Sequence, residues 1–284
     1  MAWQFLARIP VLRRLGPPLP TVAVVRLEGI IAMRGPRAIN LRRFAGALER
    51  AFRTRGLKVV ALAINSPGGS PAQSALLYRR IRQLAAERGV PVLAFTEDVA
   101  ASGGYWLALA ADEIYAEDTS LVGSIGVITA GFGFVDAMQR LGIERRLFTA
   151  GENKSLLDPF LPERDGDVVR LKTLQRDLHD SFKDLVRERR GAKLKGDEAL
   201  LFSGEVFVGR RALGLGLVDG LGDIRGVLRG MFGESVRLRA IEPERQRRFA
   251  LARLIPSFGS ESGDIVGDLL TRIEERLIWA RFGL

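Results

Sequence analysis

Apolar runs and amphipathic stretches alternate along most of this 284-residue chain. The apolar runs are rich in valine, isoleucine and leucine, which predicts strands of a parallel sheet that is covered on both faces. The amphipathic stretches repeat apolar residues every three or four positions, which predicts helices. We therefore expect an α/β fold, with strands at 21–31, 57–64 and 90–98 and helices at 40–56, 72–89 and 162–190.

The pattern is less regular in the second half of the chain. Residues 113–118 predict a short strand, 134–142 a helix and 143–151 a further strand. A glycine-rich segment lies at 120–133, and residues 204–222 predict a turn, a short helix and a return to the sheet.

No linker divides the chain, so we expect one main domain at 21–242, an N-terminal tail at 1–20 and a C-terminal helical appendage at 243–284. The appendage suits packing on the core or on a partner, with membrane contact as the alternative. It has apolar residues at helical spacing: Ile265, Leu269, Ile273, Leu277 and Ala280.

Cysteine is absent and His179 is the single histidine. This composition excludes disulfides, cysteine nucleophiles and zinc sites built from cysteine or several histidines. His179 lies in a charged helical pattern, where we expect a solvated side chain. The stretch "GFGFVD" lacks the third glycine of a dinucleotide-binding pattern. We expect no metal and no cofactor.

The net charge is +10, from 43 basic and 33 acidic residues. The arginines are spread along the chain without an interleaved aromatic block, so we expect no nucleic-acid partner. An anionic membrane surface suits the same charge. The tail mixes aromatic residues such as Trp3 and Phe5 with arginines, but no apolar run approaches the roughly 20 residues that span a bilayer. A short interfacial anchor and a strut packed on a neighbour both fit it.

The stretch "DVAASGGYWLALAA" places Ser102 before Gly103, Gly104 and an apolar helix. Glycine inside a first helical turn costs about 1 kcal/mol per residue. An N-cap serine is one explanation for this arrangement. The other is a nucleophile at the positive end of the helix dipole, where a developing oxyanion is favoured.

A second loop, "NSPGGS" at 65–70, follows the preceding strand. Its glycines would let backbone N–H groups approach a ligand closely, although an ordinary turn fits too. Both loops leave the carboxyl ends of neighbouring parallel strands, where α/β sheets bind ligands. One loop can supply a nucleophile and both can supply N–H groups, as acyl transfer requires.

A serine nucleophile needs a base. Because His179 lies in a charged helix, a lysine is the remaining candidate. A lysine acts near neutrality only if its pKa falls about 2–3 units below the ordinary value of about 10.4, which burial among apolar groups achieves. Lys154 is the candidate because Leu156, Leu157 and Phe160 follow it, although a surface-loop lysine fits the same position.

Five motifs in order, between Val22 and Gly222, resemble those of the signal peptide peptidase A family, in its short single-domain form. They are "INSPGGS", "VAASGGYWLALAAD", "LVGSIGV", "TAGENKSLLDPF" and "FSGEVFVGRRALGLGLVDGLG". The resemblance implies a Clp-protease/crotonase-type fold, in which stacked turns of parallel β-structure are flanked by helices. It also implies a serine peptidase with a Ser-Lys dyad.

The resemblance further implies a role for particular residues. Ser102 matches the nucleophile, Lys154 the general base, and Ser124 a serine that orients the lysine. The N–H groups of Gly69 and Gly103 match the oxyanion hole. The family also implies a ring-shaped homo-oligomer with active sites shared between subunits, and peptide substrates such as remnant signal peptides. Many members carry an N-terminal transmembrane helix that is not evident here, so we expect a peripheral protein at the cytoplasmic face of a bacterial inner membrane.

Two other interpretations stay open at this point. A crotonase-like acyl-CoA enzyme would use the same paired N–H groups to polarise a thioester, but neither loop supplies its catalytic carboxylate. A non-catalytic membrane-associated scaffold would need only the charge and the amphipathic ends of the chain.

Overall fold

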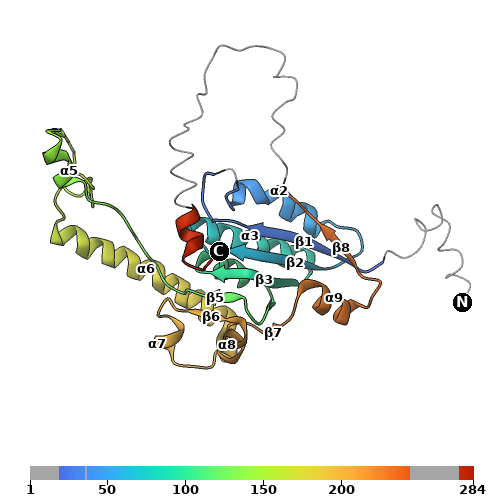
Figure 1. The fold of residues 1–284 in the computed structure, drawn as a ribbon. Helices are drawn as coiled ribbons and strands as arrows, with labels where there is room; N and C mark the ends of the chain where they lie inside the picture. The colour runs from blue at the N-terminus through green and yellow to red at the C-terminus, as the bar shows by residue number, and fades with distance from the viewer. Residues whose placement is uncertain (1–18, 36, 244–274) are drawn as a thin grey trace, which may run out of the picture.

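The computed structural model describes residues 19–35, 37–243 and 275–284 (Figure 1). Strands and helices alternate as predicted, and most boundaries lie within three residues of the expected ones. The elements, in chain order, are β1 (Thr21–Glu28), α2 (Leu41–Phe52), β2 (Leu57–Ser66), α3 (Pro71–Arg88), β3 (Val92–Ala101), α4 (Gly103–Ala108), β4 (Glu113–Ala116), β5 (Leu121–Gly123), α5 (Val135–Arg140), α6 (Asp165–Arg190), the 3₁₀ helix η2 (Gly191–Lys193), α7 (Glu198–Leu201), β6 (Val206–Val208), α8 (Gly209–Gly214), β7 (Gly220–Leu221), α9 (Ile224–Phe232) and β8 (Arg237–Ala240).

The described strands form one sheet in the order β6-β5-β3-β2-β1-β8, with β4 and β7 branching from β3. All pairs are parallel except β5 with β6. The branch arises because the first half of β3 pairs with β4 and its second half with β5. The α/β class and the parallel sheet flanked by helices are therefore confirmed.

The sheet is buried on both faces, as its apolar strands predict. Alternate residues of β1 point to opposite sides: Ala23 and Val25 join a large core with α2, α3 and α4, whereas Val22 joins a smaller cluster with Leu228 of α9. Both clusters exclude water from long apolar side chains, which is the main stabilising contribution in a domain of this size.

Side-chain caps begin the two helices that follow β1 and β2. The Asn40 side chain accepts a hydrogen bond from the Arg43 N–H at the start of α2. Ser70 caps α3, which has Pro71 in its first turn and ends at Gly89 in the left-handed conformation. The α2 helix ends at Phe52, before the predicted stop at Gly56.

The predicted strand at 143–151 is wrong. These residues are irregular and exposed, because no neighbouring strand among the described residues pairs with them. They belong to a projection that we call the arm, residues 126–178, which comprises α5, the first half of α6 and the segments between them. The arm extends away from the sheet at the upper left of Figure 1.

The second half of α6 is fixed to the sheet by a buried ion pair. The guanidinium of Arg190 lies 2.7 Å from the Asp219 carboxylate, and its side chain is only 2% exposed. Asp219 also accepts hydrogen bonds from Lys193 and the Ile114 N–H. Burial alone would raise the pKa of Asp219, but these bonds from Arg190, Lys193 and Ile114 lower it below its ordinary value.

Most of the predicted tail and appendage, residues 1–18 and 244–274, lies outside the described residues. Residues 275–280 are helical, and this segment ends near the tips of β2 and β3 in Figure 1. Within the described ranges, no helix is long and apolar enough to cross a membrane.

Candidate active site

Ser102 occupies the sharp turn between β3 and α4 in a backbone conformation that serine rarely adopts, with φ 51° and ψ −120°. Such strain costs about 1–3 kcal/mol and is typical of functional sites. The hydroxyl caps no amide of α4 and has no hydrogen-bond partner among the described residues. The N-cap explanation therefore fails. A strained strand-to-helix turn that presents a free hydroxyl is the geometry of a nucleophile elbow.

The two glycines after Ser102 are needed because other segments approach their backbone closely. A Cβ on Gly104 would lie 2.4 Å from the carbonyl oxygen of Ser66, at the end of β2. A Cβ on Gly103 would lie 2.6 Å from the hydroxyl oxygen of Ser74 on α3. Both distances are shorter than packed atoms allow. Glycine is therefore required at both positions for the start of α4 to pack on the neighbouring loop, although it disfavours a helix.

The glycine loop after β2 is held from its other side by Ile31. The Ile31 N–H donates to the carbonyl of Gly68 (2.8 Å), and the Ser70 N–H donates to the carbonyl of Ile31 (2.7 Å). In this parallel bridge the N–H of Gly69 points away from Ile31. A Cβ on Gly69 would lie 2.1 Å from the Ile31 oxygen, so only glycine fits.

The two loops meet, as predicted. A Cβ on Gly68 would lie 2.8 Å from both the Gly103 nitrogen and the Cβ of Ser102. Gly68 is a site residue that the sequence motifs did not single out beside Gly69: its positive φ of 102° and its contact with Ser102 make this position equally dependent on glycine. The only signal for it was its place in the paired glycines of "SPGGS", which do not show which one touches the second loop.

Ser124 lies beside Ser102 on the segment that follows β5. The Ser102 N–H donates to the carbonyl of Gly123 (2.8 Å), and the Ser124 N–H donates to the carbonyl of Glu205 (2.7 Å). Ser124 also has a positive φ, of 50°. Two strained serines are thus held within one small region of backbone.

The two loops that meet at Ser102 each carry a free backbone donor in the described structure. The N–H groups of Gly69 and Gly103 have no acceptor among the described residues. Gly103 is buried, where amides are nearly always paired, whereas Gly69 is exposed. Free donors on two loops that meet at a strained serine suit a negatively charged oxygen. This arrangement can stabilise the tetrahedral intermediate of acyl transfer.

Lys154 is not brought to Ser102 within one chain. It lies on the arm, in a turn that packs with α5: the Phe134 N–H donates to the carbonyl of Pro159, and the Phe134 and Phe160 rings stack at 5.4 Å. The Lys154 side chain is exposed and forms no ion pair among the described residues. The expected apolar burial of Lys154 is therefore not met in a single chain.

His179 is not the solvated residue that its charged helix predicts. It is half-buried, and its Nε2 lies 3.1 Å from the carbonyl oxygen of Ile125. Because a carbonyl only accepts, Nε2 carries the proton in this contact. No contact joins His179 to Ser102 in the described structure, so the geometry does not support a serine–histidine pair.

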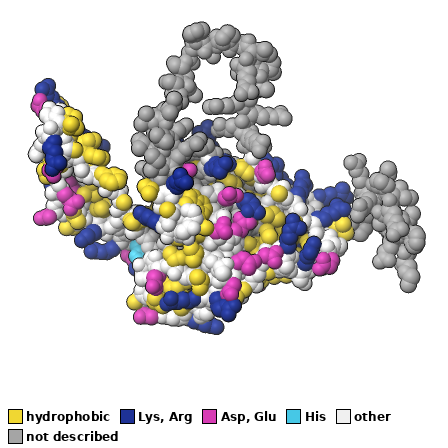
Figure 2. All heavy atoms as spheres, in the orientation of Figure 1, with side chains coloured by type: hydrophobic (Ala, Val, Ile, Leu, Met, Phe, Trp, Pro, Cys, Tyr) yellow, Lys and Arg dark blue, Asp and Glu magenta, His cyan; other side chains and the backbone are white. Residues whose placement is uncertain are grey.

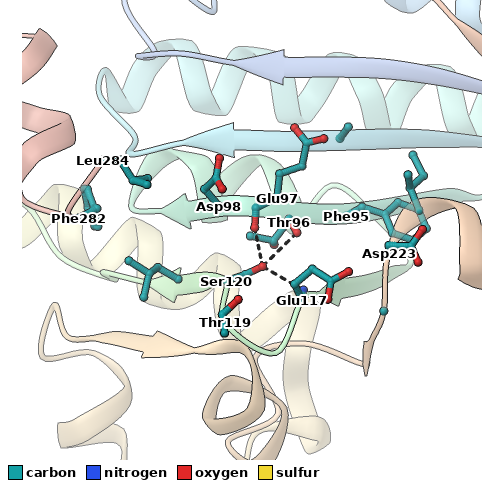
Figure 3. Close-up of a pocket in the computed structure, with 14 residues that line it drawn as sticks. Phe95, Thr96, Glu97, Asp98, Glu117, Thr119, Ser120, Asp223, Phe282 and Leu284 are labelled. Atoms are coloured by element: carbon teal, nitrogen blue, oxygen red, sulfur yellow. Dashed lines mark hydrogen bonds between the residues drawn. The ribbon is translucent and has the colours of Figure 1, made fainter.

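A cavity of about 480 Å³ lies further back along β3 (Figure 3). Phe282 and Leu284 of the C-terminal segment line one end of it, and none of the predicted site residues lines it. The Ser120 hydroxyl in this cavity is committed to the backbone, since it accepts from the Glu117 N–H and donates to the carbonyl of Glu97. Within the described residues, no cluster of three or more His, Asp or Glu side chains could hold a metal ion.

Comparison with known proteins identifies the family. A model of the family described as "Peptidase family S49" matches residues 85–234, more than half of the chain. The chain belongs to peptidase family S49. This match contains Ser102, Ser124 and Lys154, and it begins after the glycine loop.

The relatives that match this chain carry different names. The chain is 30% identical over 213 residues to the chloroplastic serine protease SPPA of Arabidopsis thaliana, covering 72% of this chain and 31% of that protein. It is 50% identical over 275 residues to a Brucella abortus protein named Na(+)/H(+) antiporter NhaA, covering 93% of this chain but only 37% of that protein. A mutant of the 1510-N membrane-bound stomatin-specific protease matches 80% of this chain in structure, at 15% identity and a TM-score of 0.49.

The S49 match and the relatives named as SPPA or SppA confirm the predicted resemblance to the signal peptide peptidase A family. They favour a peptidase over the acyl-CoA enzyme and the scaffold. The chain spans little more than a third of the Brucella protein and less than a third of the Arabidopsis protein.

Proposed function

We propose that this S49 protein is a serine endopeptidase that cleaves extended apolar peptides, including remnant signal peptides, with Ser102 as the nucleophile. Lys154 of a neighbouring chain takes the Ser102 proton, and Ser124 orients that lysine. The Gly69 and Gly103 N–H groups bind the oxyanion of the tetrahedral intermediate. Ser102 Oγ bonds to the substrate carbonyl carbon, the peptide C–N bond breaks, and the leaving amine receives the proton from Lys154. Water then hydrolyses the Ser102 ester, which releases the acid product and restores the serine.

One observation carries this proposal: the strained backbone of Ser102, whose hydroxyl has no partner among the described residues, at the meeting point of two loops that each carry an unpaired amide. A structural serine at this position would relax its backbone or use its hydroxyl as a cap. Instead the fold retains the strain, together with four close-packed glycines in the two loops. That combination is expected where a hydroxyl must be exposed to a substrate.

The arm supports a base supplied by a second chain. It carries Lys154 away from the body, and it exposes large apolar side chains that one chain leaves uncovered. Phe148 is 90% exposed and Phe132 80% exposed, and Leu141 and Ile128 are similarly open. Exposed apolar patches of this kind mark protein–protein contacts. A neighbouring chain seated on them would shield Lys154 from water, which favours the neutral amine that a base requires.

A closed ring satisfies this geometry for every subunit. If each arm reaches the next Ser102, the contact is head-to-tail, and such contacts either close into a ring or continue as a filament. A closed ring also admits unfolded peptides while excluding folded proteins. We therefore propose a ring-shaped homo-oligomer as the active form.

We also propose peripheral attachment to the cytoplasmic face of the inner membrane. The N-terminal edge of the sheet supports this, because it carries Arg53, Arg55, Lys58 and Arg237 close to residue 21, where β1 begins. All four cations are exposed and none forms an ion pair among the described residues. Lys and Arg side chains gather on this side of the molecule, at the right of Figure 2. Each contributes about 1 kcal/mol of attraction near an anionic bilayer.

The test is hydrolysis of a fluorogenic apolar peptide by the wild type, Ser102→Ala and Lys154→Ala. We expect each substitution to lower kcat at least about a thousandfold, because both residues act as one unit. Lys172→Ala, another exposed lysine on the arm, is the matched control and should retain activity. Covalent labelling of Ser102 by a fluorophosphonate should be fast only in proteins with Lys154. Equal hydrolysis by all variants would overturn the proposal.

A further inference from the structure

The single histidine lies where the arm joins the body. It is visible in cyan at that junction in Figure 2. Ile125 immediately precedes the outgoing segment of the arm, and His179 lies where the returning helix α6 reaches the body. Their contact, at 3.1 Å and 54 residues apart in sequence, therefore closes the base of the arm.

Burial along α6 changes at His179. Before it, Val169 is 64% exposed, and Leu174 and Leu178 are about as open. After it, Phe182 and Val186 are buried, and the Phe182 ring packs 4.8 Å from the ring of Trp106 on α4. Among the described residues, the His179 contact is thus the hydrogen bond to the body that lies nearest the exposed half of α6.

The other end of the contact belongs to the site. Ile125 is fully buried and follows Ser124, whose N–H is bonded to Glu205, and the carbonyl of Gly123 accepts from the Ser102 N–H. The imidazole therefore binds the same short backbone segment, 123–125, that holds Ser102 and Ser124.

We propose that His179 is a positioning residue that fixes the direction of the arm relative to the Ser102–Ser124 segment. This inference rests on the proposed function, in which the arm delivers Lys154 to the Ser102 of the next subunit. An arm of this length converts a small rotation at its base into a large displacement of Lys154. Misplacing a catalytic group by about 1 Å can cost on the order of a hundredfold in rate.

The chemistry of the hydrogen bond between His179 and the Ile125 carbonyl suits a permanent link, which we call the clamp. The Ile125 carbonyl accepts only, and the Nε2–H donor is present in both the neutral and the protonated ring. Glutamine can place an amide N–H close to the position of Nε2, whereas alanine cannot. His179→Gln is therefore the conservative variant, and His179→Ala is the one that removes the clamp.

The first test is steady-state hydrolysis of an apolar peptide by the full chain. We expect His179→Ala to lower kcat about tenfold with KM changed less than about twofold, because the amine is misplaced while the peptide site is intact. His179→Gln should recover most of the lost kcat. Arg176→Ala is the matched control and should match the wild type, since Arg176 is exposed, lies one turn earlier on α6 and has no ion-pair partner in the described part of the chain. A His179→Ala rate equal to wild type, or a glutamine variant no better than alanine, overturns the inference.

The second test needs no activity. Hydrogen exchange of the 123–128 amides is compared in Ser102→Ala and in Ser102→Ala/His179→Ala proteins. We expect about tenfold faster exchange in the double variant, since one hydrogen bond that holds this segment is lost. Unchanged exchange overturns the clamp even if the peptidase assignment holds. If Ser102→Ala alone retains hydrolysis, the proposed function fails instead, and the exchange result still decides whether His179 holds the base of the arm.

Discussion

The body of this protein and its arm differ in how completely a single chain buries their apolar side chains. In the body, the sheet is covered on both faces, Tyr105 and Phe207 are fully buried, and glycines are packed to the limit around Ser102. In the arm, large apolar side chains are open to solvent and several glycines have nothing near them, Gly131 among them. The body is complete alone, whereas the arm has the surface of a segment that another molecule covers.

This difference separates two parts of the proposed chemistry. The nucleophile and the oxyanion donors lie in the rigid body, where strain can be maintained by packing. The base lies on the arm, where its environment depends on a neighbour. A protein divided in this way would be inactive as a single chain and active only after assembly.

The largest effect on stability is expected in the body, at the buried ion pair. Asp219→Asn leaves Arg190 buried without a counter-charge, which should lower the free energy of unfolding by about 3–5 kcal/mol. The exposed pair of Arg210 with Asp118 gives a control, Asp118→Asn, with little change expected. Urea unfolding at pH 7 measures both. A loss no larger in Asp219→Asn than in the control would contradict the contrast between buried and exposed regions.

The same variant carries a pH dependence. The folded-state pKa of Asp219 is lowered, so its stabilising contribution is present above the unfolded carboxyl pKa of about 3.9 and is lost as the pH falls through the folded value. The stability gap between wild type and Asp219→Asn should therefore shrink below about pH 4. A stability difference that grows as the pH falls would mean that folding raises the pKa of Asp219 instead of lowering it.

Glycine-to-alanine substitutions, which add one methyl group, test how tightly the body and the arm are packed. Gly104→Ala would place its Cβ 2.4 Å from the Ser66 oxygen, so backbone must move, at a cost of about 1–3 kcal/mol. Gly131→Ala in the arm has no atom within 4 Å of the added group and should change stability little. Thermal unfolding followed by circular dichroism measures the pair. Similar losses in both would mean that the arm is as tightly packed as the body.

If the backbone of Ser102 is strained, a substitution that relieves the strain should raise the free energy of unfolding. Ser102→Gly relieves the positive φ and should raise the free energy of unfolding by about 1 kcal/mol while abolishing hydrolysis. Ser102→Ala, which retains the strain, should lose activity without that gain. A glycine variant no more stable than the alanine variant would argue against stored strain.

The smallest effect on unfolding is expected in the arm. Phe148→Ser removes a side chain that is 90% exposed, so the unfolding free energy of the single chain should change by less than about 0.5 kcal/mol. Self-association, measured by sedimentation velocity, should nevertheless weaken at least about tenfold because the ring contact is lost. Lys172→Ser, an exposed polar position on the same arm, serves as the control. Unchanged assembly in Phe148→Ser would remove this side chain from the interface.

The sequence predicts the fold well where local pattern and tertiary context agree. The apolar strands β1, β2 and β3 need neighbours on both sides and have them, and Asn40 and Ser70 cap the helices that follow. The failed strand at 143–151 has a suitable pattern of β-branched and aromatic residues, but a strand requires a partner. Pattern alone cannot show whether that partner exists.

The candidate site divides in the same way. The cost of two glycines after Ser102 pointed to that turn before any geometry was known. The role of Gly68 could not be predicted, because it depends on which of two adjacent glycines meets the second loop. The His179 contact was equally hidden, since it joins residues 54 positions apart and the charged helix around His179 favours solvent exposure.

The most direct test of a nucleophile and a base on different chains is to mix the Ser102→Ala and Lys154→Ala proteins under conditions that allow subunit exchange. Each is inactive alone, but a Lys154→Ala subunit retains Ser102 and its Ser102→Ala neighbour retains Lys154. Random mixing in equal amounts should restore about one quarter of wild-type hydrolysis, since half of the subunits carry each intact residue. A mixture that exchanges subunits and stays inactive would contradict the account.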